Sequence, residues 1–138
     1  MKKNFRTADA VAIQIDALYI DLHNDFSLKS LEINFPERTF RISFLRITEP
    51  QNSNSCQELT LTFLEIDYLS ASPGLVGPHG HGISELGYKA PLDLDHHWLM
   101  SEAEASPLDH LFLRFDGDEF IRLHSAQVQA KVEHFPSV

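Results

Sequence analysis

An alternation of apolar and polar residues runs through most of this 138-residue chain and limits its fold more than any other feature. Successive side chains of a β-strand point to opposite faces, so a strand with one buried face requires a period of two. The alternating segments lie at 11–19, 31–35, 40–44, 59–63, 111–115 and 121–123. Because no internal repeat or domain-sized linker divides them, we expect residues 1–138 to form a single all-β domain. An antiparallel β-sandwich or partly open barrel of about six to eight strands is the economical architecture.

Several of these segments also predict how neighbouring strands connect. Residues 11–19 carry apolar side chains at every second position and are expected to form one strand, although the spacing of Val11, Ile15, Leu18 and Leu22 would also suit one face of a helix. Residues 31–44 contain two alternating halves on either side of Pro36, which predicts a β-hairpin. Residues 111–123 do the same around Asp116 and Gly117, a pair that favours a tight turn.

Two changes of phase predict β-bulges. Leu59, Leu61 and Phe63 are apolar at odd positions, whereas the next apolar residue, Leu64, is at an even one. The phase shifts again after His124. An inserted residue in one strand produces such a shift, so we expect bulges near Phe63 and Leu64 and after His124.

Residues 70–109 lack this regularity. Glycine and proline crowd the stretch, and its apolar runs are short. Long irregular loops inside compact domains are usually functional or disordered. The sequence therefore predicts one long irregular excursion at 70–109, and a functional site is expected there first.

The charge balance favours a protein partner over nucleic acid. Eleven Lys and Arg residues stand against twenty Asp and Glu residues, a formal net charge of −9. An acidic surface repels phosphate backbones and attracts cationic surfaces, although the same charge also serves solubility alone. A basic protein is thus the expected partner, and nucleic acid is not.

Cysteine use and the N-terminal stretch indicate a cytoplasmic protein. Cys56 is the single cysteine, so no intramolecular disulfide can form, and a reducing compartment is expected. Asp9, Asp16 and Asp21 interrupt the apolar residues near the N-terminus. Neither a signal-peptide core nor a membrane span is therefore expected.

One spacing suggests a metal site. His79, His81 and Glu85 share parity, and on a strand they would point the same way and could hold a divalent ion through imidazole nitrogen and carboxylate oxygen. With the preceding Gly74, this pattern resembles the first motif of the cupin family, small β-barrels that bind a metal. The resemblance implies a later histidine as the fourth ligand, and His124 lies at a suitable distance along the chain. The alternative is a solvated loop made flexible by the glycines beside His81.

A pair of adjacent histidines is another candidate for metal binding or acid–base chemistry. His96 and His97 could supply ligands or acid–base groups. Adjacent histidines in a strand face opposite sides, which favours one packed and one solvated histidine beside a partly buried Trp98.

Asp21, His23 and Asp25 also share parity, as a general base and its orienting carboxylates would. Ser27 lies close by, but neither a glycine elbow nor an oxyanion loop accompanies it. These residues are expected to cap a strand and face water. We therefore assign no catalytic residue, and no phosphate-binding glycine loop predicts a nucleotide cofactor.

The order of signals resembles that of small β-rich immunity and uncharacterised proteins of bacterial polymorphic toxin systems. The likeness lies in His23-Asn24-Asp25 running into 28–33, in 59–63, and in the hairpin from His110 to Leu123. Such proteins are cytoplasmic and non-enzymatic, and they block a toxin by binding it. The resemblance implies a protein-binding module that captures a basic partner, with electrostatic steering of the encounter. The alternative is a cupin-like metal-binding protein or metalloenzyme using His79, His81, Glu85 and His124.

Overall fold

The computed structural model of this chain describes residues 1–50, 55–78 and 81–135, and nearly all of its regular structure is β-strand. The strands are β1 (Lys2–Lys3), β2 (Arg6–Ala8), β3 (Ala12–Ile15), β4 (Leu18–Asp21), β5 (Phe26–Asn34), β6 (Thr39–Arg46), β7 (Cys56–Ala71), β8 (Ile83–Lys89), β9 (His110–Phe115) and β10 (Phe120–His134). Two short 3-10 helices, η1 (Pro73–Val76) and η2 (Asp116–Asp118), lie in connections. Among the described residues, no helix is long and apolar enough to cross a membrane.

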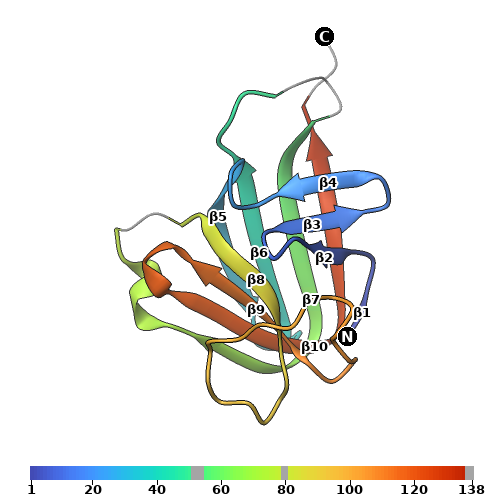
Figure 1. Cartoon of the computed structure of the whole chain (residues 1–138), viewed down its shortest axis with the longest axis vertical. Helices are drawn as coiled ribbons and strands as arrows, with labels where there is room; N and C mark the ends of the chain where they lie inside the picture. The colour runs from blue at the N-terminus through green and yellow to red at the C-terminus, as the bar shows by residue number, and fades with distance from the viewer. Residues whose placement is uncertain (51–54, 79–80, 136–138) are drawn as a thin grey trace.

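The main sheet is antiparallel and has the strand order β5-β6-β7-β10-β9-β8. It curls into a half-barrel, which confirms the expected all-β fold in its partly open barrel form (Figure 1). The curl brings its two edge strands together at one point, where the backbone amide of Leu28 donates to the carbonyl of His81 at 2.9 Å. Strand β1 adds a short parallel pairing to β10.

A smaller sheet of order β2-β3-β4 lies in front of β7 and β10 in Figure 1. Its apolar side chains Ile13 and Ile20 are buried in the same cluster as those of the main sheet. The small sheet therefore covers the open side of the half-barrel, and the two sheets share one hydrophobic core.

The alternation in the sequence accounts for this core. Leu59, Leu61 and Phe63 of β7 are fully buried, and the same holds for every second residue of the neighbouring strands. Fully burying one such side chain stabilises the fold by about 1.5–3 kcal/mol. The other inward residues are Phe40, Ile42 and Phe44 of β6, Leu111, Leu113 and Phe115 of β9, and Ile121 and Leu123 of β10.

The prediction of one strand over residues 11–19 was wrong. The structure folds this stretch into a hairpin of β3 and β4, in which Ile15 pairs with Leu18. Asp16 adopts a positive φ of 49° at the turn, a conformation that aspartate tolerates better than most residues. The apolar period continues through this two-residue turn, so periodicity alone did not reveal it.

Both predicted hairpins are confirmed. In the first, Leu31 of β5 pairs with Ile42 of β6. In the second, Leu113 of β9 pairs with Ile121 of β10. Gly117 lies at the turn between them with a φ of 80°, where a side chain would be strained.

The bulge expected after His124 is confirmed by a register shift between His124 and Ser125. On the opposite strand β7, the extra residue of this irregularity is Asp67, between Ile66 and Tyr68. The predicted position near Phe63 and Leu64 was therefore a few residues too early, because both residues still pair regularly with β6 and β10, and Glu65 after them has a positive φ of 58°.

The expected irregular excursion at 70–109 needs a correction. Strand β8 lies inside it and forms an edge of the main sheet, and residues 70 and 71 still belong to β7. The last four residues of β8, from Leu86 to Lys89, are all buried. A strand buried on both faces does not alternate, and Gly87 within it resembled a loop signal. The described residues of the excursion that lie outside these strands are 72–78, which contain η1, then 81–82 and 90–109.

Candidate functional site

The outer face of β8, β9 and β10 carries a set of buried cations. Along β9, the residues Leu111, Leu113 and Phe115 point into the core. The alternate residues His110, Phe112 and Arg114 therefore point outward. An outward face is ordinarily hydrated, but here residues 90–98 lie over it. We call this segment the 90–98 loop. The cations beneath it are Lys89 of β8, Arg114 of β9 and Arg122 of β10.

Lys89 holds the loop through an ammonium group whose side chain is only 2% exposed. Its Nζ lies 2.8 Å from the carboxylate of Asp93 and 3.2 Å from that of Asp95, and it donates to the carbonyl of Trp98 at 2.8 Å. Burial by itself would lower the pKa of Lys89, but the hydrogen bonds and charges of the two aspartates outweigh it and raise that pKa. Lys89 therefore remains charged beneath the loop.

Arg122 is equally buried and fastens the start of the loop. It donates from Nη2 to the carbonyl of Ala90 at 2.9 Å and from Nη1 to the carbonyl of Asp93 at 2.7 Å. Its Nε donates to Nδ1 of His110 at 2.9 Å, which places the His110 proton on Nε2. Burial, followed by the charge of Arg122, lowers the pKa of His110 and keeps this acceptor neutral.

His96 is the point where a loop side chain packs on the sheet. Its ring centroid lies 5.0 Å from that of Phe112 and 4.4 Å from that of Phe120. Its backbone carbonyl accepts a hydrogen bond from Arg114, which also pairs with Asp118 at 2.8 Å. Loop and sheet are thus joined by ring packing as well as by polar contacts.

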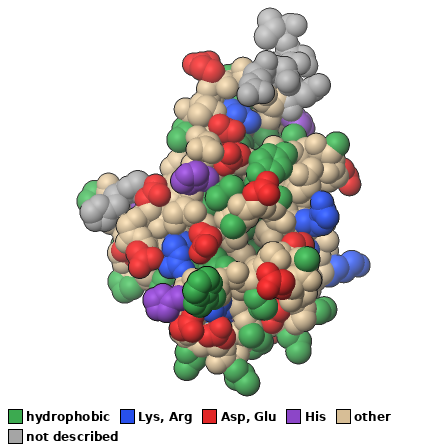
Figure 2. All heavy atoms as spheres, in the orientation of Figure 1, with side chains coloured by type: hydrophobic (Ala, Val, Ile, Leu, Met, Phe, Trp, Pro, Cys, Tyr) green, Lys and Arg blue, Asp and Glu red, His purple; other side chains and the backbone are tan. Residues whose placement is uncertain are grey.

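The opposite side of the loop presents apolar side chains to solvent. Leu92 is 93% exposed, and Leu94 and Trp98 are each 84% exposed. The segment between β8 and β9 that contains them runs along the lower part of Figure 1. In the same orientation, Figure 2 shows acidic and hydrophobic side chains intermingled over this face.

The residues expected to bind a metal either contact other groups or lie outside the described residues. His79 is outside the described residues. Nε2 of His81 lies 2.8 Å from the carbonyl oxygen of Leu75, and Glu85 pairs with Arg114 at 3.6 Å. Within 1–50, 55–78 and 81–135, no three or more His, Cys, Asp or Glu side chains are grouped so that they could hold a metal ion.

His124, the expected fourth ligand, lies on β10 and is bound at both ring nitrogens. Nδ1 is 2.8 Å from a carboxylate oxygen of Asp67, and Nε2 is 3.2 Å from the carbonyl of Pro107. This arrangement ties the bulge on β7 to the segment that leads into β9.

The other titratable residues considered for chemistry have structural roles or face solvent. The carboxylate of Asp21 accepts from the backbone amides of His23 and Asn24, each at 3.0 Å, which is the capping role expected from the sequence. His96 is packed and His97 exposed, also as expected. Trp98 was expected to be partly buried, and this was wrong: the residue is exposed, and only its backbone carbonyl contacts Lys89.

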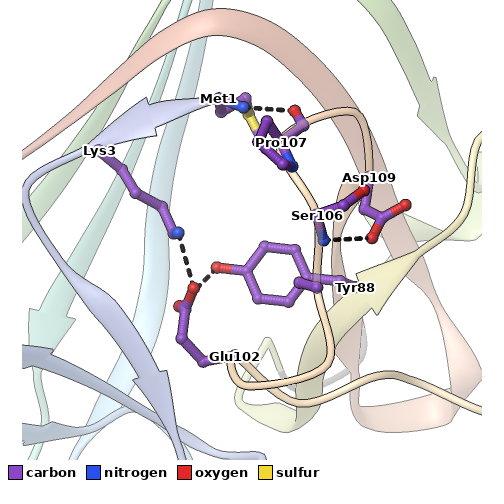
Figure 3. Close-up of a pocket in the computed structure, with 8 residues that line it drawn as sticks. Met1, Lys3, Tyr88, Glu102, Ser106, Pro107 and Asp109 are labelled. Atoms are coloured by element: carbon purple, nitrogen blue, oxygen red, sulfur yellow. Dashed lines mark hydrogen bonds and ion pairs between the residues drawn. The ribbon is translucent and has the colours of Figure 1, made fainter.

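A small cavity of about 140 Å³ lies beside the N-terminus (Figure 3). The Glu102 carboxylate at its wall accepts from Lys3 Nζ at 2.7 Å, Tyr88 Oη at 2.8 Å and the amide of Thr7 at 2.8 Å. Burial would raise the pKa of Glu102, but these hydrogen bonds outweigh it and lower that pKa. The polar groups already satisfy one another, so this cavity ties segment 101–109 to the small sheet.

The sequence reasoning did not identify Lys89, Arg114 and Arg122 as functional residues. A usable signal was present, because Arg114 and Arg122 both occupy outward positions in strands that are otherwise strongly apolar. Cations at such positions need carboxylates or carbonyls nearby, and Arg114 finds Glu85 and Asp118 whereas Arg122 finds backbone carbonyls of the loop.

Comparisons of this chain with protein-family models, with curated proteins and with solved structures found no match.

Proposed function

We propose that this protein is a non-enzymatic binding module of the immunity type, which captures a basic protein partner through the 90–98 loop. The observation that carries the proposal is the exposure of Leu92, Leu94 and Trp98 on a loop held from below by buried Lys89 and Arg122. The loop thus presents apolar side chains on a backbone fixed in place.

Fixing the loop in advance favours binding. Ordering a flexible loop on association costs free energy, and a loop already held by hydrogen bonds avoids much of that cost. Large apolar and aromatic side chains near the centre of an interface contribute most of its binding energy, and tryptophan is prominent among them. Trp98 is the natural anchor of such an interface, with Leu92 and Leu94 on the same loop.

The distribution of charge supports a basic partner. The cations of this region are covered by the loop, as with the 2% exposed side chain of Lys89, whereas carboxylates reach solvent, as with the 82% exposed side chain of Asp118. The chain as a whole has a net charge of −9. A partner with a cationic surface would be attracted at long range, which accelerates the encounter. The resemblance to immunity proteins agrees with this mode of action.

Asp93 and Asp95 are unsuited to a test of this attraction. Both carboxylates bind Lys89, so their conversion to amides would loosen the loop as well as change the surface charge. A salt series tests steering without that side effect, because salt screens charges beyond about 10 Å at 0.1 M.

The proposal is tested by affinity capture from the source organism with three forms of the protein side by side. One variant replaces Leu92, Leu94 and Trp98 with alanine, and a control replaces the exposed Val76 and Leu108 with alanine. We expect a basic protein that the parent and the control retain and the loop variant loses. Equal retention by all three forms, or a partner that is neutral or acidic, would contradict the proposal.

A further inference from the structure

His96 connects the 90–98 loop to the sheet by two different contacts. Its ring packs against Phe112 and Phe120, whose own rings stack with centroids 5.4 Å apart and an interplanar angle of 15°. Its carbonyl accepts a hydrogen bond from Arg114. Displacing this one ring would therefore disturb a polar and an apolar attachment of the loop together.

The charges around the ring oppose its protonation. The titratable and charged groups facing it are Lys89 and Glu85 from β8, Arg114 from β9, Asp118 from the turn before β10, Arg122 from β10, and Asp95 and His97 from the loop itself. The acidic members are already engaged, Asp95 by Lys89 and both Glu85 and Asp118 by Arg114. A protonated His96 would meet three cations and no uncommitted carboxylate among these groups.

We propose that His96 is a pH-sensitive latch: its neutral ring holds the 90–98 loop on the sheet, and protonation in mildly acidic solution releases the ring and loosens the loop. The significance of the latch for binding rests on the proposed function, because it would control the surface that carries Leu92, Leu94 and Trp98. The release itself requires no partner.

The direction of the pH effect follows from proton linkage. Burial, then the charges of Arg122, Arg114 and Lys89, lower the pKa of His96 below its ordinary value of 6.5. The detached ring therefore binds a proton more readily than the packed ring does. Attachment is complete above pH 6.5 and weakens as the pH falls below it, by at most about tenfold per pH unit for a single proton. Lowered pH therefore shifts the population toward the open loop.

Amide hydrogen exchange of the free protein tests the latch. The reporters are the amides of Asp93, Asp95 and His97, which donate within the loop to the Ala90 carbonyl and to the carboxylates of Asp93 and Asp95. Between pH 7.5 and 5.5, after correction for intrinsic rates, we expect their protection to fall, by at most about tenfold. Carboxylates stay ionised over this range, so the change reports on the histidines or on the N-terminal amine, whose pKa burial lowers from 8.0.

Two variants and one further measurement make the result decisive. His96→Phe keeps an aromatic ring between Phe112 and Phe120 but cannot bind a proton, so its loop protection should not depend on pH. His97→Asn removes the neighbouring exposed histidine and should behave like the parent. In the parent, the NMR titration midpoint of the His96 ring should coincide with loop release.

An unchanged protection in the parent, or a fall in His96→Phe equal to that of the parent, would overturn the latch. These outcomes are independent of partner capture. A pH-dependent loop that captures no basic protein would leave the latch standing and remove the proposed function. Conversely, salt-sensitive capture of a basic protein by a loop whose protection does not depend on pH would support the proposed function and remove the latch.

Discussion

Single residues decide whether the 90–98 loop keeps its shape, and the most demanding of them is Arg122. A buried cation is tolerated when its donors are satisfied, and the guanidinium of Arg122 reaches Ala90, Asp93 and His110 at once. Its planar arrangement of donors suits three acceptors that come from different segments. This residue therefore connects the loop to the sheet and fixes the protonation state of His110.

Arg122→Lys tests this role, because a lysine ammonium cannot reach all three acceptors from one position. We expect a loss of about 2 kcal/mol in the free energy of unfolding, the usual cost of buried acceptors left without donors. Urea unfolding measures it. The matched control is Arg41→Lys, since Arg41 and its partner Glu32 are both exposed and such pairs contribute about 0–1 kcal/mol. Equal effects of the two substitutions would show that burial of Arg122 is unimportant.

At the scale of elements, β8 is the strand that positions the site, because it ends at Lys89 and is followed directly by the loop. Tyr88 exchanges both backbone hydrogen bonds with Met100, so the chain returns to β8 after the loop. Gly87 allows this return. A Cβ on Gly87 would lie 2.7 Å from the Met100 carbonyl oxygen and 2.9 Å from the Leu99 Cβ.

Gly87→Ala should therefore push the returning segment away from β8. Overpacking of this kind costs about 1–3 kcal/mol, and it should lower the melting temperature and reduce protection of the Met100 amide. Ser84→Ala on the same strand is the control and should cost less than about 1 kcal/mol, because it removes one hydrogen bond of 3.3 Å. A Gly87→Ala protein as stable as the parent would show that the return of the chain is not tightly packed.

The sequence predicted strands well where one face is buried and poorly where both are. The β5–β6 and β9–β10 hairpins follow from alternation and turn residues. Strand β8 did not, because its two buried faces erase the period. A functional site was expected in the 70–109 stretch from its composition, but the pairing of Lys89 with Asp93 and Asp95 depends on a turn that periodicity does not describe.

At the scale of the whole molecule, the half-barrel is covered on two sides. The small sheet closes the core on one side, and the 90–98 loop covers the outer face of β8, β9 and β10. Cations are held under the loop while carboxylates and apolar side chains face solvent. This division explains how an acidic protein can carry cations on one sheet face and still present carboxylates to solvent.

The measurement that tests this account most directly is the binding kinetics of the captured partner across a salt series, for the parent and for Trp98→Ala. We expect the association rate of both proteins to fall as salt screens the encounter, while their dissociation rates change much less. Trp98→Ala should dissociate at least about tenfold faster at every salt concentration, because loss of an anchor residue costs about 2 kcal/mol or more. Dissociation rates equal to the parent's, together with association that ignores salt, would contradict the claim that the 90–98 loop is the binding surface.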